Sequence, residues 1–214
     1  ARLLGPQAQI VFFRERIEEF SLDYFLPLAS SPDGIIEDIL RLISRLKQNL
    51  VTPEAYIQFA DKLPKDDEAQ ALEKKKHTEL AIAFDTYIKL CRSNNVSDYD
   101  DQIYLTIQLL ESRPNVQKQL QDRYHTIFID EFQDTNPMQS RLIDLLARTD
   151  GELVVVGDDD QSIYGFRGAT IQNILGFKTR YPDAKEVVLT ENYRSHQAIL
   201  DSSYSLIKHN NPHR

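Results

Sequence analysis

The chain has 214 residues, of which 41% are hydrophobic, and its 33 acidic and 25 basic side chains give a formal net charge of -8. The hydrophobic share allows a packed core and excludes wholesale disorder, and no apolar stretch is long enough to span a bilayer. The acidic surplus argues against a simple basic nucleic-acid binder, so any DNA contact must come from a local patch or from base stacking.

The single cysteine and the first residues bear on the cellular compartment. Cys91 cannot form an internal disulfide, which fits a reducing compartment. The N-terminal sequence lacks the apolar core of a signal peptide, and we therefore expect a cytoplasmic protein without a membrane anchor. The chain begins with alanine rather than methionine, which favours a piece of a longer protein.

The first half of the sequence predicts helices. Apolar residues recur at helical spacing in 10–20 and again in 36–46. Thr52 and Pro53 have the order of an N-cap followed by a first-turn proline, which is typical of a helix start.

The stretch 66–92 contains neither proline nor glycine, and it predicts one long, mostly exposed helix. Lys74, Lys75 and Lys76 lie on this helix. Short charge runs usually form a solvated helix face, and contact with a DNA backbone is the alternative.

The second half alternates short apolar runs with helical segments. Residues 125–129 and 153–156 are β-branched runs typical of buried parallel strands, and 187–189 predicts a third strand. The segment 137–147 predicts a helix between the first two strands, and another helix is expected through Phe177. This alternation implies a parallel sheet with helices on its faces, and therefore an α/β fold.

Two adjacent carboxylates follow the first predicted strand. Asp130 and Glu131 stand at its C-terminal end, where ligands bind in open α/β sheets. Asp130 can hold magnesium, directly or through water, because this ion takes few protein oxygens. Glu131 can then orient an attacking water or accept its proton. The alternative is an acidic strand end that only caps the next helix.

A polar loop follows the second predicted strand. Gln161 offers a neutral amide that can bond a terminal phosphate or the attacking water. Tyr164 and Phe166 are loop aromatics that can stack on nucleic-acid bases of any sequence, and ordinary core packing is the alternative for Phe166. The acidic triplet 158–160 lacks the EF-hand spacing and predicts a turn with one acid near a nucleotide.

A third pair of candidates follows the third predicted strand. Arg194 can stabilise charge on a transferring phosphoryl group, as arginine fingers do. Tyr193 offers an aromatic face that can stack on a purine. A surface arginine that is merely solvated is the alternative for Arg194.

Together and in this order, these segments resemble the motifs of superfamily 1 DNA helicases of the UvrD, Rep and PcrA type. The matching segments are 98–103, which resembles the lead into motif II, 130–135 (motif II, or Walker B), 157–169 (motif III) and 191–195 (motif IV). The likeness is strong over 97–210 and weak over 1–96, which resembles a helical insertion.

The resemblance implies ATP and Mg²⁺ as cofactors and assigns their contacts. Asp130 would coordinate Mg²⁺, and Glu131 would act as the catalytic base. Gln161 would sense the γ-phosphate. Tyr193 would stack on adenine, and Arg194 would reach the γ-phosphate.

The resemblance also implies a DNA partner. Phe166 would stack on a base of single-stranded DNA, where many relatives carry tryptophan, and Tyr164 stands in the same loop. Arg167 would couple the nucleotide and DNA sites. The implied activity is ATP-driven movement from 3′ to 5′ on single-stranded DNA, with strand separation at duplex junctions.

One part of the family pattern is missing. No stretch matches Gly-x-x-x-x-Gly-Lys-Ser/Thr, and none of the 7 glycines is followed by lysine. We therefore expect a helical insertion (1B-like) subdomain at 1–110, the rear half of a first RecA-like P-loop NTPase domain (1A-like) at 111–191 and the start of a 2A-like segment at 192–214. Such a piece should hydrolyse ATP negligibly, and its exposed sheet edge should favour self-association.

Two other functions stay open at this stage. One is the motor part of a helicase–nuclease of recombination. The other is a non-enzymatic helical interaction module with an ATPase remnant, against which the intact polar residues Asp130, Glu131, Gln161 and Arg194 argue. A phosphate loop upstream in the open reading frame would favour the motor.

Overall fold

The structure is a computed structural model that describes residues 1–28, 31–148, 151–165 and 168–209. The first elements are β1 (Arg2–Leu3), α1 (Pro6–Arg14), η1 (Ile17–Glu19), α2 (Phe25–Leu28), α3 (Pro32–Gln48), α4 (Pro53–Lys62), α5 (Glu68–Ser93) and β2 (Val96–Ser97). The later elements are α6 (Tyr99–Ser112), α7 (Pro114–Arg123), β3 (Thr126–Ile129), η2 (Phe132–Asp134), α8 (Pro137–Leu146), β4 (Glu152–Val155), η3 (Asp159–Gln161), α9 (Gln172–Leu175), α10 (Phe177–Arg180) and α11 (Gln197–Ile207).

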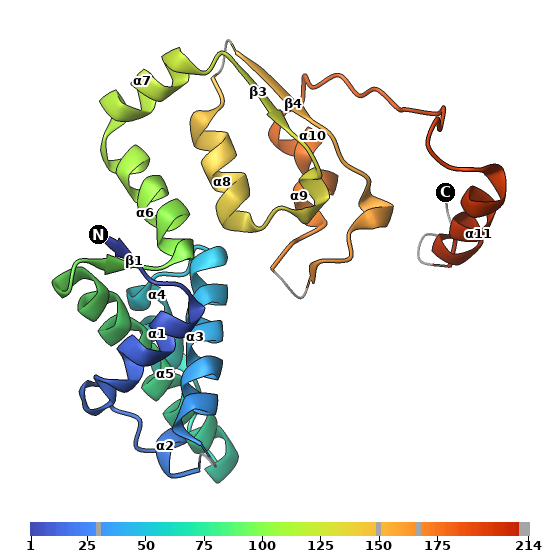
Figure 1. Cartoon of the computed structure of the whole chain (residues 1–214). Helices are drawn as coiled ribbons and strands as arrows, with labels where there is room; N and C mark the ends of the chain where they lie inside the picture. Colours follow the sequence, from blue (N-terminus) through green and yellow to red (C-terminus); the bar gives the residue numbers. More distant parts are fainter. Residues whose placement is uncertain (29–30, 149–150, 166–167, 210–214) are drawn as a thin grey trace.

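The elements from β1 to β2, called the helical unit below, enclose one hydrophobic core (Figure 1). The rings of Phe13 and Phe20 stack at its centre with centroids 3.7 Å apart. The long helix predicted at 66–92 is confirmed as α5. Its description as mostly exposed was wrong for the C-terminal half, where Phe84 and Tyr87 are fully buried, because α5 packs against the other helices of the unit.

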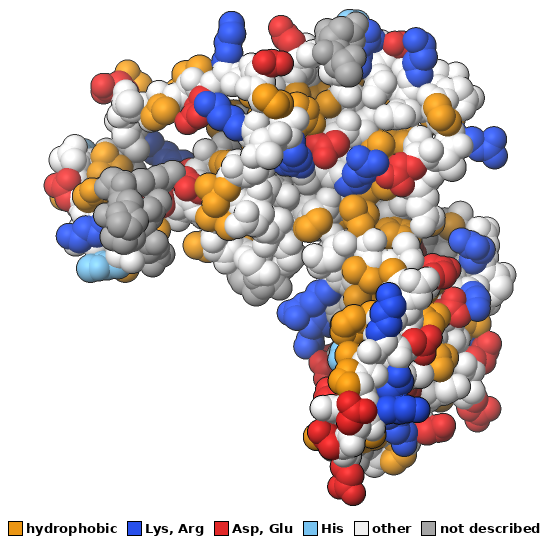
Figure 2. Space-filling view, turned by 180° about the vertical axis from the view of Figure 1, so that it is seen from behind, with side chains coloured by type: hydrophobic (Ala, Val, Ile, Leu, Met, Phe, Trp, Pro, Cys, Tyr) orange, Lys and Arg blue, Asp and Glu red, His pale blue; other side chains and the backbone are white. Residues whose placement is uncertain are grey.

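Side chains satisfy backbone groups at both ends of α4, and only the first of these contacts was predicted from the sequence. The Thr52 side chain accepts a hydrogen bond from the backbone N–H of Ala55 (3.2 Å), which confirms the predicted cap. At the other end, the Lys74 ammonium donates to the carbonyl oxygens of Asp61 and Leu63. Acidic and basic side chains are intermixed on the face of the helical unit seen in Figure 2.

The predicted parallel pairing of the first two strands is confirmed. β3 and β4 pair in parallel, with Phe128 opposite Val154 and Ile129 opposite Val155. α8, which ends one residue before the end of the helix predicted at 137–147, links them and packs against α6. Five buried side chains form the core there: Tyr104, Ile107, Leu110, Met138 and Leu145.

Other predictions about the sheet were wrong. Phe128 is 72% exposed, because alternate side chains of these strands face opposite sides and no described element covers one of them. The segment 187–189 forms no strand and is more than 70% exposed, since its backbone finds no described strand to pair with. The helix expected through Phe177 is two short helices, α9 and α10, which meet at Gly176.

The described residues are thus mostly helical with two small parallel sheets, in agreement with the α/β class. α11 lies apart from the β3–β4 pair at the end of an extended segment (Figure 1), and none of its residues is buried. No helix in the described part of the chain combines the length and apolar character needed to cross a bilayer.

Candidate functional site

The backbone turns sharply where β3 delivers its two carboxylates. Glu131 has φ 50° and ψ 44°, the left-handed region that non-glycine residues rarely adopt. Its N–H donates to Oδ1 of Asp130 at 2.9 Å. Such strained residues cluster at functional sites and persist only where their surroundings fix them. Both side chains are exposed at this strand end.

Gln133 fixes the Glu131 side chain. Its Nε2 donates to Oε2 of Glu131 at 2.7 Å, and its Oε1 accepts from the N–H of Asp158 at 3.0 Å. Gln133 is only 1% exposed, so both ends of its amide are satisfied inside the protein. Gln133 was not among the site residues predicted from the sequence. Its signal was a polar side chain in the first turn after the carboxylates.

Gly157 leaves the space that the Gln133 side chain occupies between Glu131 and Asp158. A Cβ at Gly157 would lie 2.7 Å from Oε1 of Gln133 and 2.9 Å from Cδ1 of Ile174, closer than real Cβ contacts come. Any larger residue at position 157, two residues past the end of β4, would therefore displace the Gln133 amide.

The network continues from β4 to Gln161. Oδ2 of Asp158 accepts from Nε2 of Gln161 at 2.9 Å, and Oδ1 accepts from the N–H of Asp160 at 3.0 Å. The hydrogen bonds Phe132 N–H to Val156 O (2.9 Å) and Val156 N–H to Ile129 O (2.8 Å) extend the strand pairing past both strand ends.

Three of the predicted residues therefore share one place, the carboxyl ends of β3 and β4. Glu131 and Gln161 are joined through Gln133 and Asp158, and Asp130 is adjacent to Glu131. Two carboxylates after β3 and an amide after β4 can together bind a cation and order a water molecule.

The structure does not bring Tyr193 and Arg194 to this place. Tyr193 is 94% exposed, and the backbone N–H of Arg194 donates to Oδ1 of Asn192 at 2.9 Å in a local turn. In the described residues no hydrogen bond or ion pair joins either side chain to the β3 and β4 ends. Tyr164 is half-buried in the loop after η3. Phe166 and Arg167 lie outside the described residues.

The oxygen atoms at the end of β3 suit magnesium better than a metal ion that needs three or more protein ligands. Among the described residues no three His, Cys, Asp or Glu side chains form a metal cage. Oδ1 of Asp130 already accepts the Glu131 N–H, and its second oxygen has no described hydrogen-bond partner. Mg²⁺ is usually held by one or two carboxylates together with waters and substrate phosphates, so one open carboxylate is sufficient.

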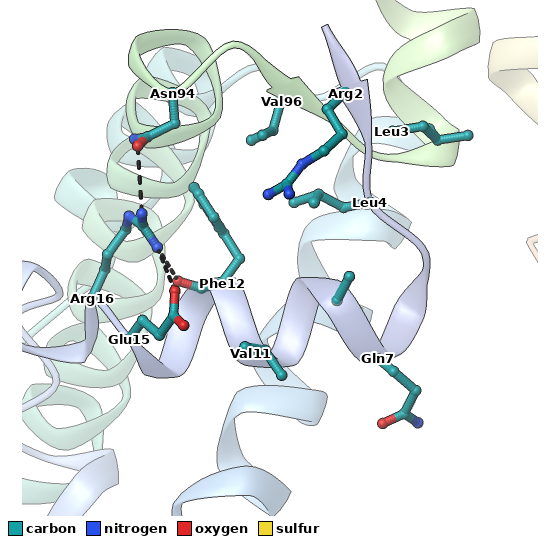
Figure 3. A pocket seen from close by; sticks show the side chains of 11 residues that line it. Arg2, Leu3, Leu4, Gln7, Val11, Phe12, Glu15, Arg16, Asn94 and Val96 are labelled. Carbon is teal, nitrogen blue, oxygen red and sulfur yellow. Dashed lines mark hydrogen bonds and ion pairs between the residues drawn. The ribbon is translucent and has the colours of Figure 1, made fainter.

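Two cavities of the described structure lie away from these strand ends. One of about 560 Å³ is lined by β1 and α1, where Arg16 donates to the Phe12 carbonyl and to Oδ1 of Asn94 (Figure 3). Another, of about 340 Å³, lies between α4, α5 and α6. Neither of these two cavities is lined by Asp130, Glu131 or Gln161, whose side chains are exposed beyond the strand ends.

Comparison with known proteins identifies the family. Residues 7–182 match the UvrD/REP helicase N-terminal domain. The chain is 42% identical over 173 residues to the ATP-dependent DNA helicase PcrA of Leuconostoc citreum, covering 81% of this chain and 22% of that protein. The PcrA of Staphylococcus epidermidis is 43% identical over 168 residues (78% and 21%), and that of Staphylococcus aureus 33% over 227 aligned positions (98% and 31%).

The chain thus spans only about a fifth to a third of the length of these relatives. The family match nevertheless extends over most of the chain, and it includes both strand ends described above. The chain belongs to the UvrD/Rep helicase family.

Proposed function

We propose that this chain supplies the magnesium and water-activating half of the ATPase site of a DNA helicase that moves 3′ to 5′ on single-stranded DNA. The observation that carries the proposal is the bonded series from Glu131 through Gln133 and Asp158 to Gln161, which ties the two strand ends together. The curated relatives named above are ATP-dependent DNA helicases, which supports the same assignment.

Each residue at the strand ends has a proposed role. Bound Mg²⁺ and ATP supply the charge balance and the phosphoryl group to be transferred. Asp130 holds the metal through its open oxygen. Glu131 orients the attacking water and accepts its proton, and its hydrogen bond from Gln133 fixes the direction of the carboxylate. Gln161 bonds the terminal phosphate with its neutral amide.

The remaining proposed residues lie away from these strand ends. Tyr193 would stack on the adenine ring, and Arg194 would stabilise the transferring phosphoryl group. Both are exposed, so this role requires the segment 192–195 to meet the nucleotide in another arrangement of the chain. Tyr164, Phe166 and Arg167 are the proposed DNA-contact and coupling residues.

The 214-residue chain alone is proposed to be inactive. It has no phosphate-binding loop, and phosphoryl transfer depends mostly on positioning and charge stabilisation of the phosphates. The proposed organisation remains a helical insertion at 1–110, part of a RecA-like domain at 111–191 and the start of a further domain at 192–214. We also propose that the chain self-associates through β3 and β4, where no third described strand covers either edge.

The test is Glu131→Gln in the protein expressed from its complete reading frame. The proposal predicts ATP hydrolysis that single-stranded DNA stimulates in the wild type and that falls by about 100-fold or more in the variant. Glu152→Gln is the matched control, because Glu152 is exposed at the opposite end of the same strand pair. A wild type without DNA-stimulated hydrolysis would refute the motor, and an active Glu131→Gln would remove Glu131 from its role.

A further inference from the structure

Gln48, the last residue of α3, connects the helical unit to α6. Its Nε2 donates to Oδ1 of Asp100 at 3.1 Å and lies 3.1 Å from Oγ of Ser44. The Ser44 hydroxyl donates to the other oxygen of the same carboxylate at 2.5 Å. Two polar side chains of α3 thus hold one carboxylate in the first turn of α6.

The other end of the Gln48 amide lies against Gly168. A Cβ built on Gly168 would stand 2.5 Å from Oε1 of Gln48 and 3.9 Å from Cβ of Asn136. Gly168 has φ 88°, a left-handed conformation that favours glycine, and its N–H donates to the Gly165 carbonyl at 3.0 Å. The backbone at Gly168 is therefore in direct contact with the helical unit.

The chain after Gly168 is bound to the segment that follows Glu131. Thr170 N–H donates to the Thr135 carbonyl at 3.2 Å. Nδ2 of Asn173 donates to the same carbonyl at 2.8 Å and to the Thr135 hydroxyl oxygen at 3.0 Å. Thr135 directly follows η2, which carries Gln133. Gln48 thus reaches a loop that is itself bonded to the proposed catalytic segment.

Buried ion pairs next to Gln48 hold the end of α3 against the start of α6. The neighbouring Lys47 is completely buried and bonds Asp98 and Asp101 at 2.6 Å each, which ties the two helices together. Charge-assisted bonds of this kind are among the strongest in proteins. The position of the Gln48 side chain is accordingly fixed relative to both helices.

We propose that Gln48 is a positioning residue that holds the backbone at Gly168, and that through it the helical unit sets how strongly single-stranded DNA stimulates ATP hydrolysis. This inference rests on the proposed function, because Phe166 and Arg167, which precede Gly168 in sequence, are the proposed DNA-contact and coupling residues. Gln48 touches neither nucleotide nor DNA in this proposal, and it acts only through the loop.

The test uses Gln48→Met in the protein expressed from its complete reading frame. Methionine keeps the length of the side chain but removes the amide. Gln58→Met is the matched control, because Gln58 is exposed on α4 of the same unit. Two quantities are measured for each variant: amide hydrogen exchange at Gly168 and Thr170 without DNA, and ATP hydrolysis as a function of single-stranded DNA concentration.

We expect Gln48→Met to lower the exchange protection of Gly168 by about 3- to 10-fold, because the variant loses both the hydrogen bond to Asp100 that fixes the Gln48 side chain and the contact of Oε1 with the Gly168 backbone. The DNA concentration for half-maximal stimulation should rise by a similar factor, with hydrolysis in the absence of DNA unchanged. Gln58→Met should match the wild type in both measurements. Unchanged exchange at Gly168, or an equal fall of basal and stimulated hydrolysis, would overturn the positioning role.

A double-mutant cycle keeps the inference testable even if a single variant is unstable. Gly168→Ala places a methyl group on Oε1 of Gln48, and Gln48→Ala removes the atom it strikes. The two substitutions should therefore be less than additive in thermal stability, and additive effects would contradict the contact. If the wild type shows no DNA-stimulated hydrolysis, the proposed function fails, whereas the exchange and the cycle still decide whether Gln48 holds Gly168.

Discussion

Replacing Lys47 by methionine should destabilise this protein far more than the loss of an ordinary ion pair. The Lys47 side chain is 0% exposed, and its Nζ lies 2.6 Å from Oδ2 of Asp98 and 2.6 Å from Oδ1 of Asp101. The Tyr87 hydroxyl also donates to Oδ2 of Asp98, at 3.2 Å. Methionine fills most of the same volume but leaves two buried carboxylates without their cation.

The loss of unfolding free energy that we expect for Lys47→Met follows from the burial of these charges. Removing one partner of a buried ion pair typically costs about 3–5 kcal/mol, because the remaining charge stays desolvated. With a urea dependence of about 2 kcal/mol per molar, the unfolding midpoint of Lys47→Met should fall by about 2 M. Lys89→Met is the control, because Lys89 makes an exposed pair with Asp85 on one helix, which is worth about 0.3–0.5 kcal/mol.

The pH dependence gives a second check on Lys47. Burial lowers the pKa of its ammonium, but Asp98 and Asp101 outweigh burial and raise this pKa above its ordinary value. The stabilisation is therefore fully present below the unfolded pKa of lysine and is lost as the pH rises through the folded pKa. The penalty of Lys47→Met should also shrink in acid, because burial raises the pKa of Asp101 and its protonation removes part of the unpaired charge. A penalty below about 1 kcal/mol at neutral pH would refute the reasoning.

Three further results are expected. Gln133→Ala should lower DNA-stimulated ATP hydrolysis of the complete protein by about 10- to 100-fold, as loss of a side chain that orients a catalytic group does, and wild-type turnover would exclude Gln133 from that role. Burial raises the pKa of Cys91 to about 11, so a thiol reagent should label only the unfolded chain, and the folded chain should lose stability as the pH rises from about 9 to about 11. Phe128→Lys should reduce the self-association of the 214-residue chain in light scattering, and equal scattering by both chains would place the contact elsewhere.

Features encoded by neighbouring residues could be predicted from the sequence. The Thr52 cap depends on a bond only three residues along the chain, and the strands 126–129 and 152–155 depend on short runs of β-branched residues. The two polar strand ends could be placed at one edge because parallel strands end on the same side. This rule holds for any parallel sheet, so the prediction needs no knowledge of individual side-chain contacts.

Features that depend on distant partners could not be predicted in the same way. The apolar run 187–189 reads as a strand, but a strand needs a neighbour to pair with, and none is available among the described residues. Lys47 lies on the buried face of α3 together with three isoleucines, and only the fold brings it to carboxylates 51 and 54 residues away. Gln133 meets Asp158 across 25 residues through the register of β3 and β4.

Different contacts hold the proposed catalytic residues and the proposed DNA-contact loop. The geometry of Glu131 and Gln161 depends on the β3–β4 register and on the space left by Gly157, because Gln133 must reach both strand ends. The backbone at Gly168 instead depends on Gln48 of the helical unit. Since the loop after Gly168 is bonded to Thr135, a shift of the helical unit can reach the catalytic segment through that loop, through the α3–α6 ion pairs or through the contact between α3 and α8. Substitutions at Gln48 should therefore change the response to DNA, whereas substitutions at Gln133 should change the chemical step itself.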